Sequence, residues 1–280
     1  MKEPTVGVVV AARNAELTIG AALQTVLSQT VPPSQIVVIS DGSIDRTAEI
    51  AEATLRLHSA SLVVELPQSI GRAAARNLAV GQLSTDFVAV CDADDMSFDN
   101  RFHELQRLAQ LEGADVVSGQ ALVVTSRGFA YDLTMMPTEH AEIVRQLEEG
   151  LMSVIHPACI IRRQSFVDAG AYTTALLRAQ DLDLMIRLSR LGCRFVSSSK
   201  PLIAYQYPVL IGRQRLAEQR SYADMARQLN GIGYPPGSRT WAETNLRGVL
   251  RASLNRSVRL EKRRRIAHYA RLLESQCQTL

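Results

Sequence analysis

The chain has 280 residues, of which 46% are hydrophobic and 21% are charged, and its formal net charge is +3. This composition is typical of a globular protein with a sizeable core, and no run of about 18 apolar residues predicts a membrane span. The four cysteines lie far apart and form no CxxC pair, which argues against a zinc site or a disulfide framework. We therefore expect reduced thiols and a cytoplasmic protein.

Strand and helix patterns alternate along the first half of the chain. Continuous apolar runs predict buried strands over residues 5–12, 35–43, 61–67, 86–95 and 114–124. Helical patterns lie between them, over residues 15–29, 46–58, 71–83 and 101–113. The alternation predicts an α/β fold with a doubly wound, Rossmann-like, mostly parallel sheet and helices on both faces. The N-terminal segment fits the first strand rather than a signal peptide.

The second half has a less regular pattern. Residues 157–170 predict a strand followed by a short helix, and residues 193–199 and 201–207 predict two short strands. Further helical patterns cover residues 140–151, 181–192 and 210–233. No internal repeat and no low-complexity segment interrupts the chain, so one α/β unit with a helical extension is expected.

Two acidic turns follow predicted strands, the sequence DGS at residues 41–43 and DADD at residues 92–95. Ligands of doubly wound sheets bind beyond the carboxyl ends of the strands, so both turns are expected at one crevice. Clustered carboxylates repel one another unless a cation compensates them. Mg²⁺ and Mn²⁺ prefer carboxylate oxygens, and the pair Asp92 and Asp94 therefore suggests a divalent-cation site. A solvated acidic turn is the alternative.

Four other residues have an ordinary and a functional interpretation, and a fifth has an ordinary one. Asp41 is either a turn residue or an acceptor for a nucleobase or ribose. Arg76 either solvates a helix surface or reaches the same crevice. Asp181 and Asp183 open a predicted helix, where an N-cap is the ordinary role and a general base the functional one. His156 is expected to serve packing.

Several ordered segments resemble the family 2 glycosyltransferases, which are inverting enzymes of the GT-A fold. They are VGVVVAARN, QIVVISDGS, GRAAARNLAVG, FVAVCDADD, HPACIIRRQSFVDAGAY and AQDLDLMIRLSRLG, and the resemblance spans residues 5–207. It implies a transferase that moves a sugar from a nucleoside-diphosphate sugar, commonly linked to uridine diphosphate, to an acceptor hydroxyl. It also implies a nucleotide-sugar-binding half at 1–120, an acceptor-side half at 121–210 and a C-terminal helical extension at 211–280.

The resemblance implies roles for individual residues. The nucleotide sugar would be bound by Ala11, Ala12, Arg13, Asn14, Asp41, Gly71, Arg76, Asp92 and Ala93. Asp94 would bind Mn²⁺ or Mg²⁺ at the diphosphate, with Asp92 as a second metal contact. Asp181 would be the catalytic base, and the further candidates on the acceptor side are His156, Gln180 and Asp183.

Three positions depart from the family's pattern. The usual Glu-Asp before the acceptor helix is Gln180-Asp181, which keeps the base but loses the acid beside it. The usual Pro-Thr-Tyr-Asn after the first strand is AARN at residues 11–14, so the aromatic residue that stacks on the base is missing. Pro208 stands near the place where many members of the family have a metal-binding His. An inactive nucleotide-sugar-binding or scaffold protein is therefore the alternative. A sugar nucleotidyltransferase ranks lower, because no glycine-rich loop follows the first strand.

The C-terminal part of the chain is strongly basic. Residues 245–271 contain nine Lys or Arg and one acidic residue, so this segment has a net charge of +8 and the remainder about −5. From Trp241 onward the apolar residues recur at helical spacing, which predicts an amphipathic helix. Packing on the body, a helix-mediated dimer, and peripheral contact with the inner membrane face are all compatible with it. The last would suit a lipid-linked acceptor, although the acceptor hydroxyl could equally belong to a glycan. Nucleic acid is not expected as a partner.

Overall fold

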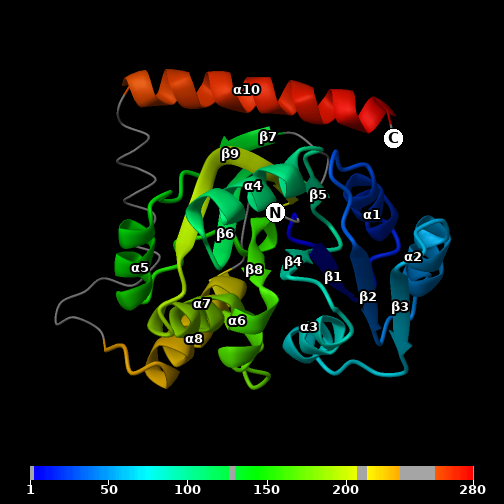
Figure 1. The fold of residues 1–280 in the computed structure, drawn as a ribbon, viewed down its shortest axis with the longest axis horizontal. Helices are drawn as coiled ribbons and strands as arrows, with labels where there is room; N and C mark the ends of the chain where they lie inside the picture. The colour runs from blue at the N-terminus through cyan, green and yellow to red at the C-terminus, as the bar shows by residue number, and fades with distance from the viewer. Residues whose placement is uncertain (1–2, 126–129, 207–212, 234–255, 280) are drawn as a thin grey trace.

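The computed structural model describes residues 3–125, 130–206, 213–233 and 256–279. They form one sheet flanked by helices, with strand order β3-β2-β1-β4-β8-β6-β9-β5 and β7 paired to β6 (Figure 1). The strands are β1 (Val6–Ala12), β2 (Gln35–Asp41), β3 (Ser61–Leu66), β4 (Phe87–Cys91), β5 (Met96–Ser97), β6 (Val116–Val124), β7 (Ala130–Leu133), β8 (Ile160–Arg162) and β9 (Phe195–Gln206). The helices are α1 (Ile19–Leu27), α2 (Thr47–Leu55), α3 (Arg72–Gly81), α4 (Arg101–Glu112), α5 (His140–Glu148), the 3₁₀ turn η1 (His156–Ala158), α6 (Arg163–Asp168), α7 (Gln180–Arg190), α8 (Arg213–Leu229) and α10 (Arg256–Thr279).

The first four strands confirm the predicted doubly wound arrangement. β1 to β4 pair in parallel, in the order β3-β2-β1-β4. Alternate side chains of β1 enter two cores: Val8 and Val10 pack in the cluster with Leu23 of α1, and Val9 packs in the cluster with Val80 of α3. Burial on both faces explains why these strands are continuous apolar runs rather than alternating ones.

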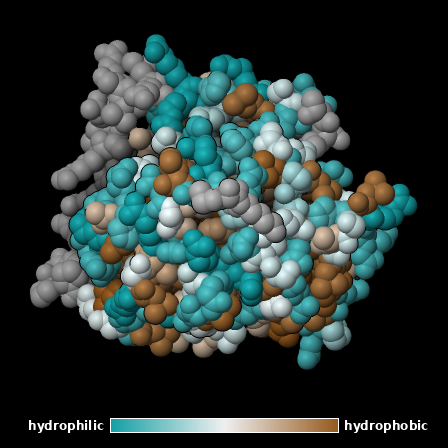
Figure 2. Space-filling view, in the orientation of Figure 1, coloured by the Kyte–Doolittle hydropathy of each residue, from teal (hydrophilic) through white to brown (hydrophobic). Residues whose placement is uncertain are grey.

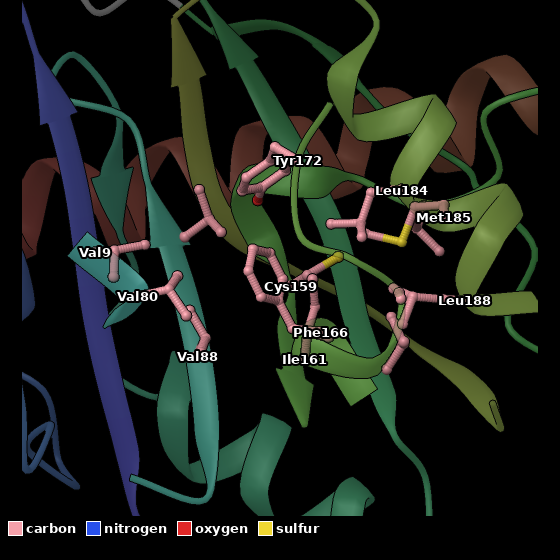
Figure 3. Packing of buried hydrophobic residues seen from close by; sticks show 14 of the residues in the cluster. Val9, Val80, Val88, Cys159, Ile161, Phe166, Tyr172, Leu184, Met185 and Leu188 are labelled. Carbon is pink, nitrogen blue, oxygen red and sulfur yellow. The ribbon is translucent and has the colours of Figure 1, made fainter. Parts of the chain in front are cut away.

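The second half of the sheet is not mostly parallel, which corrects the predicted pairing there. β8 lies antiparallel between β4 and β6, β7 is antiparallel to β6, and β5 is antiparallel to β9. Only β6 and β9 pair in parallel among these strands. Figure 3 shows the core beside β8, where Cys159 and Ile161 lie near Phe166 of α6 and Leu188 of α7. The expected boundary at residues 120 and 121 lies inside β6, so both halves share this strand.

The two short strands expected at 193–199 and 201–207 are one strand, β9. Pro201 interrupts the apolar pattern, and proline cannot donate to a sheet ladder. The β6–β9 register shifts on both sides of Gln120, which pairs with Pro201, so an irregularity accommodates the proline and the strand continues.

The C-terminal extension packs on the body. In α10, Leu273 is buried against Phe98 and Leu122, and the helix lies across the edge of the molecule beside β7 (Figure 1). The predicted tail helix is thus confirmed from Arg256, whereas its expected start at Trp241, like Pro208, lies outside the described residues. No helix among the described ranges has the length and apolarity needed to cross a membrane. The predicted free thiols are confirmed for Cys91, Cys159 and Cys193, which are buried, and Cys277 is not described at its side chain.

Candidate active site

Two cavities adjoin one another beyond the carboxyl ends of β1 and β4. The first has a volume of about 550 Å³ and includes the predicted residues Ala11, Ala12, Arg13, Asn14, Asp41, Gly71, Asp92, Ala93 and Asp94. The second has a volume of about 330 Å³ and includes the predicted residues Arg76, Asp92, His156, Gln180 and Asp181. Arg72, Asp92 and Tyr205 line both cavities and therefore form the wall between them.

The strand register brings the two acidic turns together. Val10 of β1 pairs with Cys91 of β4, and Ala11 pairs with Ile39 of β2, so the three strands end at the same edge of the sheet. The turns that follow them therefore face one crevice, as the sequence predicts.

Asp41 holds the loop before α3 against the end of β2. Its carboxylate accepts hydrogen bonds from the Ser69 hydroxyl at 2.8 Å, the Ile70 amide at 2.7 Å and the Gly71 amide at 3.1 Å. Gly42, with φ of +63°, permits the close approach, because a Cβ there would lie 2.3 Å from the Ser69 nitrogen. The Asp41 carboxylate thus makes long-range bonds to the loop before α3 rather than bonds within its own turn, and its contact with a nucleobase stays a prediction.

Arg76 lies in the wall of the second cavity and not of the first. Its Nη2 donates to Asp92 Oδ1 at 2.5 Å, and the Arg76 side chain is only 5% exposed against 26% for Asp92. Burial opposes the ionisation of Asp92, but the Arg76 guanidinium holds the pKa of that carboxyl below its ordinary value. The pair therefore keeps a charged carboxylate on the wall between the cavities.

The remaining carboxylates of the turn differ in environment. Asp95 is buried, and its Oδ1 accepts from the Gln206 amide at 2.9 Å. Burial, and then the neighbouring Asp92 charge, raises the pKa of Asp95 well above its ordinary value. The hydrogen bond from Gln206 connects this carboxyl to β9. Asp94 is exposed and lines the first cavity. Two carboxylates, Asp92 and Asp94, are thus presented to a ligand.

This donor set fits a divalent cation that also takes ligands from a phosphate. The described residues contain no group of three or more His, Cys, Asp or Glu side chains that could hold a metal ion. Mg²⁺ is commonly bound by one or two carboxylates together with substrate phosphates and water. Asp92 and Asp94 meet that requirement in a cavity large enough for a phosphate-bearing ligand.

Asp181 is the carboxylate of α7 that lines the second cavity. Its Oδ1 accepts a hydrogen bond from the backbone amide of Leu182 at 3.0 Å, which leaves oxygen lone pairs for a ligand. Asp183 is buried and accepts from Thr173, Arg187 and Asn230, so the structure places it in a packing role away from the cavity. Gln180 lines the cavity, but its amide donates to the Leu176 carbonyl at 2.6 Å.

His156 confirms the expected packing role and also lines the second cavity. It is 4% exposed, and its Nε2 lies 2.7 Å from the Tyr172 hydroxyl. Burial, and then the neighbouring Arg76 charge, lowers the pKa of His156 to about 4. The ring is therefore neutral at physiological pH.

The His156 pKa predicts a loss of stability in weak acid. Because the folded-state pKa lies below the ordinary value of 6.5, the stabilisation is complete above pH 6.5 and is lost as the pH falls towards 4. Relative to His156→Gln, the wild-type free energy of unfolding should fall by about 2 kcal/mol between pH 7.5 and pH 5. Urea unfolding at both pH values measures this difference. Relative to the control His103→Gln, which replaces an exposed histidine, the wild-type free energy of unfolding should not fall. An equal fall relative to both variants would contradict the low pKa of His156.

The model of the family described as glycosyl transferase family 2 matches residues 7–170, which is more than half of the chain. The chain belongs to glycosyltransferase family 2. The amylovoran biosynthesis glycosyltransferase AmsB of Erwinia amylovora is 25% identical over 231 residues, covering 80% of this chain and 76% of AmsB. The succinoglycan biosynthesis protein ExoU of Rhizobium meliloti is 26% identical, covering 67% and 58% respectively.

Solved structures confirm the GT-A fold. S. aureus TarS 1-349 in complex with UDP-GlcNAc superposes with a TM-score of 0.64 at 20% identity, covering 80% of this chain and 66% of that one. The family 2 match and the glycosyltransferase relatives establish that the chain is a glycosyltransferase. They give no support to a sugar nucleotidyltransferase.

Several residues of this glycosyltransferase's cavities escaped the sequence reasoning. They are Arg72 and Tyr205 on the shared wall, and Met152, Arg178, Gln219 and Ala223 around the second cavity, and apart from Arg72 they carry no local signal for a site. Only Arg72 offered a clue, since it precedes Arg76 by one helical turn in the same GRAAARN segment. Gln219 and Ala223 belong to α8, beyond the residues that the family model matches.

Proposed function

We propose that this glycosyltransferase moves a sugar from a nucleoside-diphosphate sugar to an acceptor hydroxyl by a single displacement that inverts the anomeric centre. The observation that carries the proposal is the pair of adjoining cavities. Asp94 lies in the first, Asp181 in the second, and Asp92 on the wall between them. In this arrangement the donor diphosphate occupies the first cavity and the acceptor hydroxyl approaches from the second.

The residues of the second cavity would perform the proton transfer. Asp181 accepts the proton of the acceptor hydroxyl as that oxygen attacks the anomeric carbon. The attack comes from the side opposite to the diphosphate, which explains inversion in one step. His156 is neutral and its Nε2 is engaged by Tyr172, so it contributes no competing cation beside Asp181.

The residues of the first cavity would stabilise the leaving diphosphate. Gly71 and Arg72 stand at the N-terminus of α3 in the cavity wall, where backbone N–H groups and the helix dipole favour negative charge. Asp94, with Asp92 as a second contact, would hold Mg²⁺ or Mn²⁺, and a divalent cation bound there supplies positive charge to the departing phosphates.

Uridine diphosphate is the first nucleotide to test, and a polysaccharide or lipid-linked glycan the first acceptor class. The TarS complex named above contains UDP-GlcNAc, and the AmsB and ExoU relatives are named for polysaccharide biosynthesis. The three carboxylates of the proposed chemistry, Asp92, Asp94 and Asp181, all face the cavities, which favours an active enzyme over a scaffold.

The test is calorimetric binding of UDP, GDP and dTDP and their sugars, with and without Mn²⁺. The wild type should bind one nucleotide more tightly with the metal, and that nucleotide should raise the melting temperature. Asp94→Asn should lower affinity at least about tenfold when Mn²⁺ is present and change it little without metal. The matched control Asp99→Asn, also exposed but outside the cavity, should behave as wild type. A folded wild type that binds none of these nucleotides would refute the proposal.

A further inference from the structure

The outer side of α10 carries arginines that the described body does not use. Arg263, Arg264 and Arg271 are exposed, and none of them forms an ion pair with another described residue. Arg264 and Arg271 are seven residues apart, which is about two helical turns, so they lie on the same side of the helix. Arg264 and Arg271 thus place two positive charges on the same exposed side of α10, and Arg263 flanks them about 100° around the helix.

The opposite side of α10 is fixed to the body. Leu273 is 6% exposed in the cluster with Phe98, and the Tyr269 ring lies edge-on to Phe98 with centroids 5.9 Å apart. Gln276 Nε2 donates to the Ser97 carbonyl at 2.9 Å. At about 100° per residue, Arg264 points away from the side that Leu273 buries. The apolar contacts therefore decide that the arginines face outward.

The charge distribution of this face suits an anionic partner. Exposed arginines on one helix produce a positive potential that attracts negatively charged ligands and surfaces. Residues 262–271 of α10 contain five Lys or Arg and no Asp or Glu, whereas the chain outside residues 245–271 has a net charge of about −5. An anionic surface would therefore attract this face and repel the body, which would orient the molecule.

The shape of the face suits a planar partner. α10 spans Arg256–Thr279, 24 residues, and crosses one edge of the molecule as a straight rod (Figure 1). The upper edge of the molecule in Figure 2, where α10 lies, is mostly hydrophilic. A single-stranded nucleic acid would need aromatic side chains for base stacking, but Tyr269 is turned inward against Phe98. A row of charges along a straight ridge can instead meet a flat surface at several points at once.

We propose that the outer face of α10, with Arg263, Arg264 and Arg271, docks this protein on an anionic lipid surface. The helix does not insert, because its apolar side is already buried against the body. Docking is electrostatic and reversible, and it weakens as salt increases. It holds the enzyme at a membrane by a contact that is separate from the two cavities.

The test is sedimentation of the full chain with lipid vesicles. The wild type should bind vesicles containing about one-third phosphatidylglycerol and not those of phosphatidylcholine alone, and added salt should release it. Each basic residue near an anionic surface raises binding by about fivefold, so Arg264→Gln with Arg271→Gln should lower the partition at least about tenfold. The matched double variant Arg56→Gln with Arg190→Gln removes two exposed arginines elsewhere, on the ends of α2 and α7, and should bind as wild type.

Three results would overturn the proposal. They are equal binding to both kinds of vesicle, an equal loss in the two double variants, and binding to a single-stranded oligonucleotide that exceeds binding to anionic vesicles. Nucleotide affinity and melting temperature are measured on the same samples. They separate a failure of docking from a failure of the proposed catalytic function or of folding.

Discussion

Asp181→Asn is expected to lower the rate of nucleoside-diphosphate release by about 10²- to 10⁴-fold and to leave nucleotide-sugar affinity unchanged. An amide cannot accept the acceptor proton, whereas the donor is expected in the first cavity, which Asp181 does not line. The fold should persist, since the hydrogen bond that the Asp181 carboxylate accepts comes from the adjacent Leu182 amide. Rates are measured with water and with glycan acceptors, and affinity by calorimetry.

Asp183→Asn is the matched control on the same helix. Its carboxylate is buried and accepts from Thr173, Arg187 and Asn230, so this substitution should lower the melting temperature. The rate should fall much less than in Asp181→Asn. An Asp181→Asn variant that keeps the wild-type rate would assign the base to another residue, and one that loses donor binding would place Asp181 in the donor site.

The first half of the fold was predictable from sequence because its strands are buried on both faces. Runs such as Val6–Ala12 and Phe87–Cys91 are read directly as parallel strands, and parallel strands end at one sheet edge. The positions of Asp41, Asp92 and Asp94 beside one cavity follow from that topology alone. In this half of the chain, the strands expected from the apolar runs are the strands of the folded sheet.

The second half was less predictable because its strands depend on distant partners. β5 has two residues and β7 has four, and each exists only because β9 or β6 lies beside it. The antiparallel insertion of β8 between β4 and β6 likewise has no local signal in its three residues. Pro201 suggested a break between two strands, although the neighbouring register shift absorbs it.

The candidate site likewise combines features that local sequence predicts with features that only tertiary packing determines. A helical pattern places Arg76 on α3, but it does not tell whether the guanidinium turns to a nucleobase or to Asp92. The second cavity combines Asp92, His156, Asp181 and Gln219, which stand on separate elements far apart in sequence. Only the packing of α7 and α8 on the sheet brings them together, so sequence spacing could not define this cavity.

Arg76→Met is expected to destabilise the protein by about 3 kcal/mol near neutral pH. Methionine fills much of the arginine's space, but the Asp92 carboxylate loses the guanidinium that lies 2.5 Å away. Water reaches Asp92 through the cavity, so the loss of stability should lie at the lower end of the range measured when one partner of a buried ion pair is removed. Arg72→Met removes an exposed arginine one turn earlier on the same helix and should change stability by less than about 0.5 kcal/mol.

The pH dependence separates charge pairing from packing. The pKa of Asp92 is depressed in the folded protein. The Arg76–Asp92 pair therefore stabilises the folded protein at pH values above the ordinary Asp pKa. This stabilisation is lost as the pH falls through the folded-state pKa of Asp92. The stability gap between the wild type and Arg76→Met should therefore narrow as the pH is lowered from 7 towards 3, measured by urea unfolding. A gap that stays constant would mean that Arg76 acts by packing against Tyr172 rather than by holding Asp92 ionised.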